Sequence, residues 1–495
     1  MKRALLSVWN KEGIIDLARV LTAAGVEIIS SGGTAKTLEK AGIPIIEVST
    51  YTGHPEMMDG RVKTLHPRIH GGLLGRRGKD EAEMAENNIG PIDLLVVNLY
   101  PFEEMAAQAL PLDELIEFID IGGPTMIRAA AKNFRDVTVV IDPADYLLIM
   151  DAVRSGSDTR YDLRLSLAKK VFARMAAYDS AISNYLHSLD GGFPEVISVQ
   201  FRNGRTLRYG ENPHQEAAVY GIEGIAGAVP VQGKAMSYNN YLDLDSAVSL
   251  LREFQECAAV IVKHNNPCGV ATGKSVKEAY IAARDVDPVS AYGGIVAVNR
   301  EVGVDLATEI AGTFIEVLMA PSFTGEARVI LAGKENLRVL ILPEPVGQEE
   351  IRTIDGGALL QRTPAFREEW HVVTDRDPTA EEEAAMQISM KICRHTKSNA
   401  IIFADATGAL AIGAGQMSRV DAAKIAISKA TRPLKGSAVA SDAFLPFADT
   451  LQVAAEAGAT ALIQPGGSIR DNEVIAEANR LNMAMVFTGV RFFRH

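Results

Sequence analysis

The chain has 495 residues, about three times the usual size of one domain, so we expect two or three domains. Apolar residues make up 47% and charged residues 23% of it, a composition that is typical of globular proteins and excludes a disordered or fibrous chain. The 50 Lys and Arg against 62 Asp and Glu give a net charge of -12, which disfavours a general nucleic-acid binder. Any anionic ligand must therefore meet a local basic cluster.

The cysteines and the N-terminus indicate the compartment. Cys257, Cys268 and Cys393 are odd in number and form no CxxC pair, which argues against a disulfide framework and a thiolate zinc site. We therefore expect a reducing compartment, the cytoplasm. The first apolar stretch ends at Trp9 and is too short for a signal peptide, and no apolar run approaches the roughly 18 residues of a membrane helix. We expect no membrane partner.

The first 140 residues alternate strand-like and helix-like patterns. Strands are expected at residues 4–9, 26–30, 43–48, 94–99 and 137–141, and helices at residues 14–24, 35–41 and 125–133. This alternation predicts an α/β domain with a parallel sheet and crossover helices. Sheets of this kind bind ligands beyond the carboxyl ends of their strands.

A long amphipathic helix is expected between residues 160 and 189, where apolar residues recur every three or four positions. Asp190, Gly191, Gly192 and Pro194 break this pattern, so we place domains at residues 1–190 and 195–495. The second domain is again mixed α/β, with apolar runs at residues 258–262, 294–298, 400–403 and 461–463. Similar turns after two of these runs suggest two related subdomains with a split near residues 360–380, although there is no strict repeat.

The first candidate ligand site is the sequence SSGGT after the strand at residues 26–30. Ser31, Gly32, Gly33 and Thr34 would lie near a helix N-terminus, where free amides and the helix dipole favour a phosphate. A plain strand-to-helix turn with a capping threonine would have the same sequence, because short glycine motifs have low specificity.

A basic segment follows at residues 61–79, which carry six Lys or Arg, two His and no acidic residue. Two cations near a substrate oxyanion can bind phosphate and stabilise charge that develops in a transition state. A solvated surface loop is the alternative. Polar residues also follow the strand at residues 94–99 and precede the helix that carries Lys132; they include Asn98, Tyr100 and Asp120. Each of them alone is as often structural as functional.

In the second half, Lys263 and His264 lie at the end of an expected buried strand, in the sequence VKHNNPCG. A neighbouring cation favours the neutral imidazole, which is a base near pH 7. Two alternatives stay open: a buried histidine satisfied by hydrogen bonds, or a zinc ligand together with Cys268. The H-x-E and PCxxC patterns of zinc deaminases are missing, so we expect no zinc.

Four other segments have a composition that suits ligand binding. The segment LRYGENPHQ places Arg208 and Tyr209 in a turn-rich stretch, and residues 413–419 and 465–474 each open an expected helix. The segment SDAFLPFAD supplies Phe444 and Asp449, an aromatic side chain and a carboxylate that suit a flat heteroaromatic ligand or, equally, the edge of a core.

Taken together, these segments resemble one family, that of the bifunctional aminoimidazole carboxamide ribonucleotide transformylase and inosine monophosphate cyclohydrolase of purine biosynthesis. The resemblance covers nearly the whole chain and follows the family's order. It implies a methylglyoxal-synthase-like α/β domain followed by two cytidine-deaminase-like subdomains. The matching motifs are SGGTAKTL, RVKTLHP, NLYPF, DIGGPTMIRAAAKN, LRYGENPHQ, VKHNNPCG, GAGQMSR, SDAFLPF, PGGSIRDNEV and the terminal FFRH.

The resemblance implies that the first domain closes the purine ring. Lys63 would polarise the formyl oxygen, and the residues that assist proton movement would be Tyr100, Asp120 and Lys132. The residues expected to hold the nucleotide are Ser31, Gly33, Thr34, Arg61, Thr64 and Asn98.

The resemblance also implies that the second domain transfers a formyl group from 10-formyltetrahydrofolate to the 5-amino group of the ribonucleotide. His264 would act as base and Lys263 would stabilise the oxyanion or protonate the folate nitrogen. The expected nucleotide contacts are Arg208, Tyr209, Asn399, Arg419, Phe444, Arg491 and His495, and those towards the folate are Gly293, Glu316 and Asp449. The family works as a homodimer with transformylase sites at the interface, and some members hold a structural potassium ion.

The chain departs from the family pattern in two places. Trp9 and Asn10 stand where relatives usually show Ser and Asp, and Phe492 stands where many show His. We assign no role to these residues and no sites to residues 324–367. Two competing functions remain: the first domain as an allosteric nucleotide-binding module only, and the second as a zinc hydrolase. The set of Lys63, Tyr100, Asp120 and Lys132 speaks against the first, since binding alone needs no acid–base set.

Overall fold

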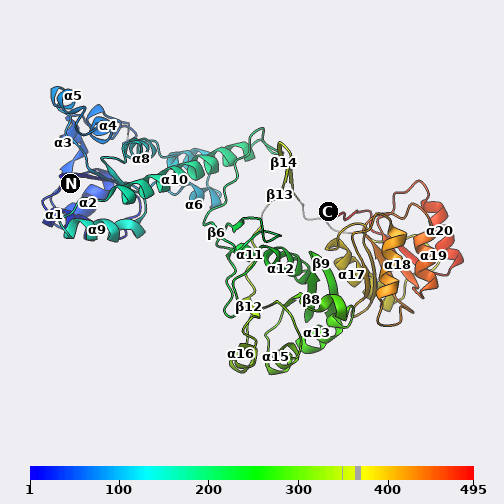
Figure 1. The fold of residues 1–495 in the computed structure, drawn as a ribbon. Coiled ribbons are helices and arrows are strands. Elements are labelled where there is room, and N and C mark those ends of the chain that lie inside the picture. Colours follow the sequence, from blue (N-terminus) through cyan, green and yellow to red (C-terminus); the bar gives the residue numbers. More distant parts are fainter. Residues whose placement is uncertain (59, 348, 363–368) are drawn as a thin grey trace. The chain divides into compact units, whose positions relative to one another are not determined.

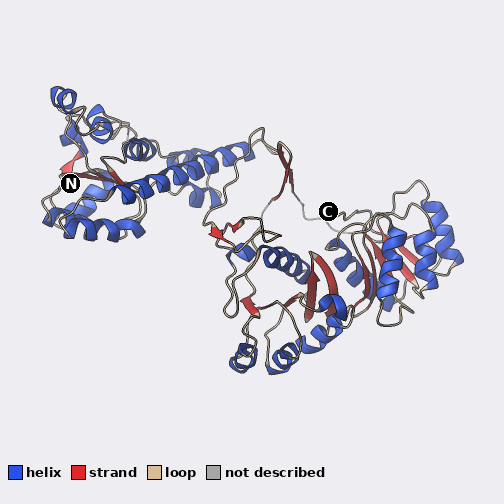
Figure 2. Ribbon diagram, viewed as in Figure 1, coloured by secondary structure: helices blue, strands red, loops and turns tan. Residues whose placement is uncertain are grey.

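The structure is a computed structural model that describes residues 1–58, 60–347, 349–362 and 369–495. The chain divides into two compact units, Met1–Gln200 and Phe201–His495 (Figure 1). Both units are built from helices and strands in alternation (Figure 2). The break expected at residues 190–194 lies in the last part of the first unit.

The first unit contains a five-stranded sheet in the order β3-β2-β1-β4-β5, in which each neighbouring pair is parallel. Its strands are β1 (Arg3–Leu6), β2 (Glu27–Ser30), β3 (Ile46–Glu47), β4 (Leu94–Val96) and β5 (Thr138–Val140). Its helices are α1 (Ile14–Ala23), α2 (Gly32–Lys40), α3 (Val48–Thr52), α4 (Pro67–Leu74), α5 (Glu81–Glu86), α6 (Phe102–Ala107), α7 (Leu112–Leu115), α8 (Gly122–Lys132), α9 (Tyr146–Arg154) and α10 (Tyr161–Ser188), with 3-10 turns η1 (Ile116–Phe118) and η2 (Pro143–Asp145).

Both faces of this sheet are buried, as the continuous apolar runs of its strands require. In β1, Ala4 and Leu6 belong to one hydrophobic cluster and Leu5 belongs to the other, because successive side chains point to opposite faces. The parallel sheet expected from the sequence is confirmed. Only the ends of the strands remain open to a ligand.

The elements differ from the expected ones mainly at their ends. The strand expected at residues 43–48 shrinks to two residues, since it is an edge strand and α3 starts at Val48. The strands expected to reach Trp9 and Leu99 end at Leu6 and Val96, and the residues beyond form loops. The expected long helix is present as α10.

The second unit contains an eleven-stranded sheet in the order β12-β11-β10-β8-β9-β17-β16-β18-β19-β20-β15. Its strands are β8 (Ala258–Lys263), β9 (Asn266–Thr272), β10 (Ile295–Val298), β11 (Val317–Ala320), β12 (Arg338–Ile341), β15 (His371–Val372), β16 (Ile401–Asp405), β17 (Gly408–Gly413), β18 (Ala438–Ser441), β19 (Ala461–Gln464) and β20 (Ala484–Phe487). Two small ribbons stand apart from it: β6 (Arg205–Thr206) with β7 (Ala218–Val219), and β13 (Glu350–Ile354) with β14 (Gly357–Gln361).

The large sheet consists of two halves with the same topology. Each half contains an antiparallel hairpin, β8-β9 or β16-β17, with three strands in the same arrangement beside the first hairpin strand, and the second half adds β15 at its outer edge. The two subdomains expected from the sequence are therefore present. The helices of this unit are α11 (Gly224–Gly227), α12 (Tyr238–Leu251), α13 (Val276–Arg284), α14 (Pro288–Ala291), α15 (Val304–Ala311), α16 (Gly325–Ala332), α17 (Ala380–Arg394), α18 (Arg419–Lys429), α19 (Asp449–Glu456) and α20 (Asp471–Arg480).

The split between the halves falls between β12 and β15. Of the expected range near residues 360–380, residues 363–368 lie outside the described part of the chain. Strand β15 pairs with β20 and so belongs to the second half. The two hairpins join where Gly408 of β17 pairs with Ala271 of β9, at a place where a side chain on Gly408 would meet the carbonyl oxygen of Val270.

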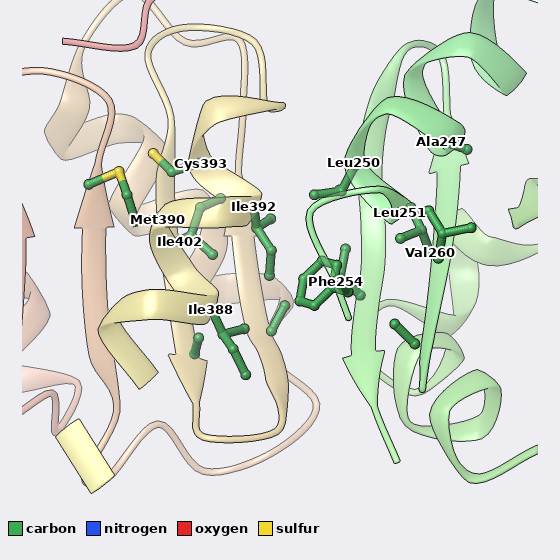
Figure 3. Close-up of a cluster of buried hydrophobic side chains, with 14 of the residues drawn as sticks. Ala247, Leu250, Leu251, Phe254, Val260, Ile388, Met390, Ile392, Cys393 and Ile402 are labelled. Atoms are coloured by element: carbon green, nitrogen blue, oxygen red, sulfur yellow. The ribbon is translucent and has the colours of Figure 1, made fainter. Parts of the chain in front are cut away.

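One hydrophobic core runs through both halves (Figure 3). It contains Leu250 and Leu251 of α12, Ile388 and Ile392 of α17, and side chains of the central strands. Separate clusters fill the opposite face of each half. Among the described helices, none is both long enough and apolar enough to cross a membrane.

In the second half, helix α18 packs closely on strand β17, so we expect a larger side chain at their contact to destabilise the protein. A Cβ atom on Gly413 of β17 would overlap the backbone carbonyl of Ala422 in α18. We expect Gly413→Ala to destabilise the protein by about 1–3 kcal/mol or more, because the helix must move away from the sheet. Thermal unfolding of the full chain measures it. Gly325→Ala is the control, since a Cβ atom there meets open space; an equal loss in both variants would contradict this packing account.

Candidate functional site

The first candidate site is a cavity of 770 Å³ in the first unit. It lies at the carboxyl ends of β1, β2 and β4, where the following loops meet. The structure brings together here most of the residues predicted for the first domain, namely Ser31, Gly33, Thr34, Arg61, Lys63, Thr64, Asn98, Tyr100 and Asp120.

The N-terminus of α2 forms one wall of this cavity. Ser31 is the N-cap residue, with extended backbone, and its hydroxyl lies 3.5 Å from that of Ser7. The hydroxyl of Thr34 donates to the carbonyl of Val8 (3.0 Å) and accepts from its amide (2.9 Å), which fastens the β1–α1 loop to the helix. The first amides of a helix have no partner within the helix, so this wall suits a phosphate.

Two ammonium groups lie against the same helix turn. A Cβ atom on Gly32 would be 3.1 Å from Nζ of Lys63, and one on Gly33 would be 3.9 Å from Nζ of Lys11. Burial and the charge of Lys63 lower the pKa of Lys11. The positive charge is therefore concentrated where an anion would bind. Arg61 also lines the cavity and pairs with Glu117.

Asp120 also lines the cavity and is held there by hydrogen bonds. Its carboxylate accepts a hydrogen bond from the amide of Gly123 (2.9 Å), and its own amide donates to the hydroxyl of Tyr178 in α10 (2.8 Å). Burial raises the pKa of Asp120, and burial together with the charge of Asp120 raises the pKa of Tyr100. A Cβ atom on Gly122 would lie 2.8 Å from Oγ1 of Thr64, so this close approach requires glycine.

Lys132 is not brought to this cavity. It is the last residue of α8 and is exposed. The first residues of α8 line the cavity, and at 1.5 Å per residue the length of the helix places Lys132 about 15 Å from them. The sequence correctly predicted the helix but not that its C-terminus points away from the site. Lys11 also lines the cavity, and it was not predicted from the sequence. Its position after an expected buried strand could have indicated it, because such strand ends often bind ligands.

In the second unit, His264 occupies the tight turn of the β8-β9 hairpin. His264 and Asn265 have positive φ values of 52° and 61°, as a two-residue type I′ turn requires. The amide of Asn265 donates to Asp243 (2.7 Å) and its side chain accepts from Ser246 (3.1 Å), so α12 holds the turn in place. His264 itself is exposed, which excludes the buried-histidine alternative.

Lys263, the last residue of β8, points toward the neighbouring strand end. Its ammonium group donates to the carbonyls of Gly293 (2.9 Å) and Tyr292 (3.2 Å). Gly293 has a φ of 69°, and a Cβ atom there would be 3.0 Å from Phe314 and 3.1 Å from Nζ of Lys263. A glycine is therefore needed for the lysine to lie so close.

A cavity of 330 Å³ contains Lys263 and His264, and both halves of the large sheet contribute to it. Lys429 of α18 donates to Asp287 of the first half (2.9 Å), which ties the halves together at this cavity. Cys268 also lines it, but its thiol donates to a backbone carbonyl, and burial raises its pKa to about 12. Within the described ranges, no three His, Cys, Asp or Glu side chains are grouped to hold a metal ion.

Arg208 and Tyr209 line a different cavity of 840 Å³, together with Glu316. The guanidinium of Arg208 lies 4.9 Å from the ring centre of Tyr209. Glu316 accepts from the side chain of Asn240 (3.0 Å) and lies 3.8 Å from Arg338. Phe314 lines this cavity and adjoins Gly293, the residue that Lys263 contacts.

The remaining predicted residues lie in the second half. The side chain of Asn399 donates to the carbonyl of Gln416 (2.9 Å), which lines the His264 cavity. Arg419 lies 3.3 Å from the buried carboxylate of Asp442. Three of the predicted residues surround the ring of Phe493, and these are Arg419 (5.7 Å), Arg491 (4.4 Å) and His495 (5.7 Å).

Phe444 and Asp449 are exposed after β18, and neither lines the two cavities just described. Phe492, which the sequence left without a role, packs against the core shared by both halves, and its amide donates to the carbonyl of Asp442 (2.9 Å). The structure therefore distributes the second-domain residues over several places of one chain.

Comparison with known proteins gives two family matches. A model of the AICARFT/IMPCHase bienzyme matches residues 130–429, and a model of the MGS-like domain matches residues 13–125. A solved chain titled "Crystal structure of ForH" is 33% identical, covers 39% of this chain and 100% of its own, and has a TM-score of 0.35, which is too low to support an argument.

Three curated relatives match over their full length, each with the name "Bifunctional purine biosynthesis protein PurH". The relative from Rhodospirillum rubrum is 51% identical over 520 residues, covering 100% of this chain and 99% of its own. The relative from Halalkalibacterium halodurans is 50% identical over 509 residues, covering 100% of both chains. The relative from Magnetococcus marinus is 49% identical over 530 residues, covering 100% of this chain and 99% of its own.

The burial of Asp120 predicts a measurable titration. Because burial disfavours the charged carboxylate, Asp120 should take up its proton at a higher pH than an ordinary aspartate. Carbon NMR of aspartate-labelled protein, assigned with Asp120→Asn, measures this. Asp80 is the internal control: its hydrogen bonds with Arg76 lower its pKa to about 2. A pKa of Asp120 at or below that of a free aspartate would contradict the buried-carboxyl account.

Proposed function

The chain belongs to the family of AICARFT/IMPCHase bienzymes, and from that premise we propose how its residues divide the two reactions. It is a bifunctional enzyme of purine biosynthesis. It transfers a formyl group to the 5-amino group of 5-aminoimidazole-4-carboxamide ribonucleotide and cyclises the formylated product to IMP with loss of water. The formyl donor is 10-formyltetrahydrofolate, a co-substrate.

The first unit closes the ring in the 770 Å³ cavity. The observation that supports this assignment is the meeting of an open helix N-terminus, two ammonium groups and a buried carboxyl in one place. The phosphate binds at Ser31, Gly33 and Thr34 of α2, where amides and positive charge suit it. The other groups that hold the nucleotide are Lys11, Arg61, Thr64 and Asn98.

Ring closure joins the carboxamide nitrogen to the formyl carbon. Lys63 donates to the formyl oxygen and stabilises the negative charge that develops on it. Asp120 removes a proton from the attacking nitrogen, and its raised pKa makes it a stronger base than an ordinary aspartate. The protonated hydroxyl of Tyr100 donates to the oxygen. That oxygen then leaves as water, with one hydrogen from the attacking carboxamide nitrogen and one from the formamido nitrogen, as the formamido nitrogen forms its double bond to the former formyl carbon. Lys132 has no place in this scheme.

The second unit transfers the formyl group at the β8-β9 turn. The amine of the substrate is a weak nucleophile, because its lone pair is delocalised into the imidazole ring. His264 is exposed and held by the turn, and it accepts the proton of the amine as the nitrogen bonds to the formyl carbon. Lys263 lies beside it and stabilises the tetrahedral oxyanion, or protonates the folate nitrogen as it leaves.

We assign the nucleotide and folate contacts of the second unit as the sequence suggested. The nucleotide contacts are Arg208, Tyr209, Asn399, Arg419, Phe444, Arg491 and His495, and the folate contacts are Gly293, Glu316 and Asp449. Their spread over one chain supports a homodimer in which a second chain completes each transformylase site. Exposed apolar side chains between residues 193 and 231 also support a partner, and they include Phe193, Val196, Ile197, Val199, Phe201, Tyr220 and Ile222.

The enzyme acts in the cytoplasm in this proposal, which the three free thiols support. Neither reaction as written requires zinc. A structural potassium ion remains part of the proposal, although no residues are assigned to it.

The two reactions should be separable. A chain ending at Gln200 retains the whole ring-closing cavity, so we expect it to cyclise the formylated nucleotide without folate. In the full chain, Lys63→Ala should slow ring closure by about 100- to 1,000-fold, the usual effect of removing one oxyanion donor, while formyl transfer is unchanged. Steady-state assays of each half-reaction measure this. Lys79→Ala is the matched control, from the same basic segment but outside the cavity; loss of both activities in Lys63→Ala would refute separate sites.

Formyl transfer should depend on the turn residue. We expect His264→Ala to lower its turnover by about two to four orders of magnitude, because the attacking amine loses its base. Lys263→Ala should also lower turnover, and ring closure should survive both changes. His371→Ala, an exposed histidine of the same unit, is the control. If His264→Ala kept its turnover but bound the nucleotide much more weakly, His264 would be a ligand contact rather than the base.

A further inference from the structure

Trp9 is anchored in the ring-closing cavity by its backbone. The amides of Trp9 and Asn10 both donate to the side-chain oxygen of Asn98, at 2.6 and 2.8 Å. The ammonium group of Lys11 donates to the carbonyl of Trp9 at 3.1 Å. Residues that line the cavity therefore fix the position of this tryptophan, although its side chain differs from the usual family pattern.

The indole ring contacts two other aromatic rings and is still about half exposed. Its centre lies 5.0 Å from that of Tyr100 and 6.1 Å from that of Phe118, the second pair edge to face. Yet Trp9 keeps 47% of its surface exposed and lines the cavity. A large aromatic face that is held in place and open at a cavity is typical of a ligand contact.

The cavity thus has two kinds of wall. Lys11, Lys63 and the first turn of α2 supply positive charge and amides, and Trp9 with Tyr100 supplies flat apolar surface. A nucleotide has the matching two parts, a phosphate and a planar base. We propose that Trp9 is the stacking surface for the base in this cavity and that it favours the closed purine over the open imidazole. This inference rests on the ring-closing function proposed for the first unit.

The chemistry of ring closure explains the preference. The formamido and carboxamide groups must come into the plane of the imidazole before the new bond can form. A flat aromatic face gains contact as these groups become coplanar, and the closed purine presents a larger π surface than the imidazole alone. Trp9 therefore acts as a specificity-determining and positioning residue, which binds IMP more tightly than the unclosed nucleotide.

Three substitutions in the full chain separate stacking from packing. Trp9→Ala and Trp9→Leu should weaken IMP binding by about 5- to 100-fold, the range measured for loss of a stacked aromatic, and Trp9→Phe should restore most of it. Leucine keeps apolar contact with Tyr100 but has no π face. Calorimetry measures IMP affinity, and kinetics of ring closure give KM and kcat; we expect a higher KM and a lower kcat in the alanine and leucine variants. IMP affinity in Trp9→Leu equal to that of the unaltered chain would overturn the proposal.

Fluorescence gives a second, independent readout. The chain has two tryptophans, so Trp370→Phe leaves Trp9 as the sole tryptophan. We expect IMP to quench its emission and ribose 5-phosphate, which lacks the base, to leave it nearly unchanged. Calorimetry gives the IMP concentration that saturates the site. If the emission of Trp9 were not quenched at that concentration, the stacking role would be overturned but the ring-closing function would not. Failure of the unaltered chain to bind IMP or close the ring would overturn the ring-closing function and, with it, this inference.

Discussion

The sheets of both units are covered on both faces by helices, and this burial restricts where polar chemistry can occur. Strands such as β1, β4 and β8 are almost entirely apolar, and each of their apolar side chains belongs to one core or the other. A polar side chain within such a strand would lack water and partners. Ligand-binding groups are therefore confined to the strand ends, where the chain leaves the sheet.

The strand ends that carry the ligand-binding groups are arranged differently in the two units. In the first, the parallel strands end at one edge, so Ser31, Lys63, Asn98 and Asp120 converge on a single cavity within one chain. In the second, the repeated hairpin topology places candidate residues on two halves, and the cavity around His264 needs both. A self-contained site suits ring closure of one substrate. A distributed site suits a transfer between two large substrates and an assembly in which a second chain takes part.

The sequence predicted most of the fold, because strands that are buried on both faces have continuous apolar sequences. Helix α10 was also predictable, because its apolar residues recur every three or four positions. It predicted the convergence of the first site less completely. Lys11 was missed because the strand expected to reach Trp9 ends at Leu6. Lys132 is the last residue of α8, away from the end that lines the cavity, and a motif fixes the residue types along a helix but not which end faces a cavity. The exposed turn position of His264 was not predicted from the sequence, because His-Asn is an uncommon pair for a type I′ turn.

The central claim is that one chain performs formyl transfer and then ring closure. The fate of the formyl carbon tests this claim most directly. The intact enzyme would be given the aminoimidazole nucleotide and 10-formyltetrahydrofolate labelled with ¹³C in the formyl group, and the products would be followed by NMR. The account predicts that the label appears in IMP, at the ring carbon between the former amine and carboxamide nitrogens. Label that stays in the open formylated nucleotide, or that never leaves the folate, would contradict it.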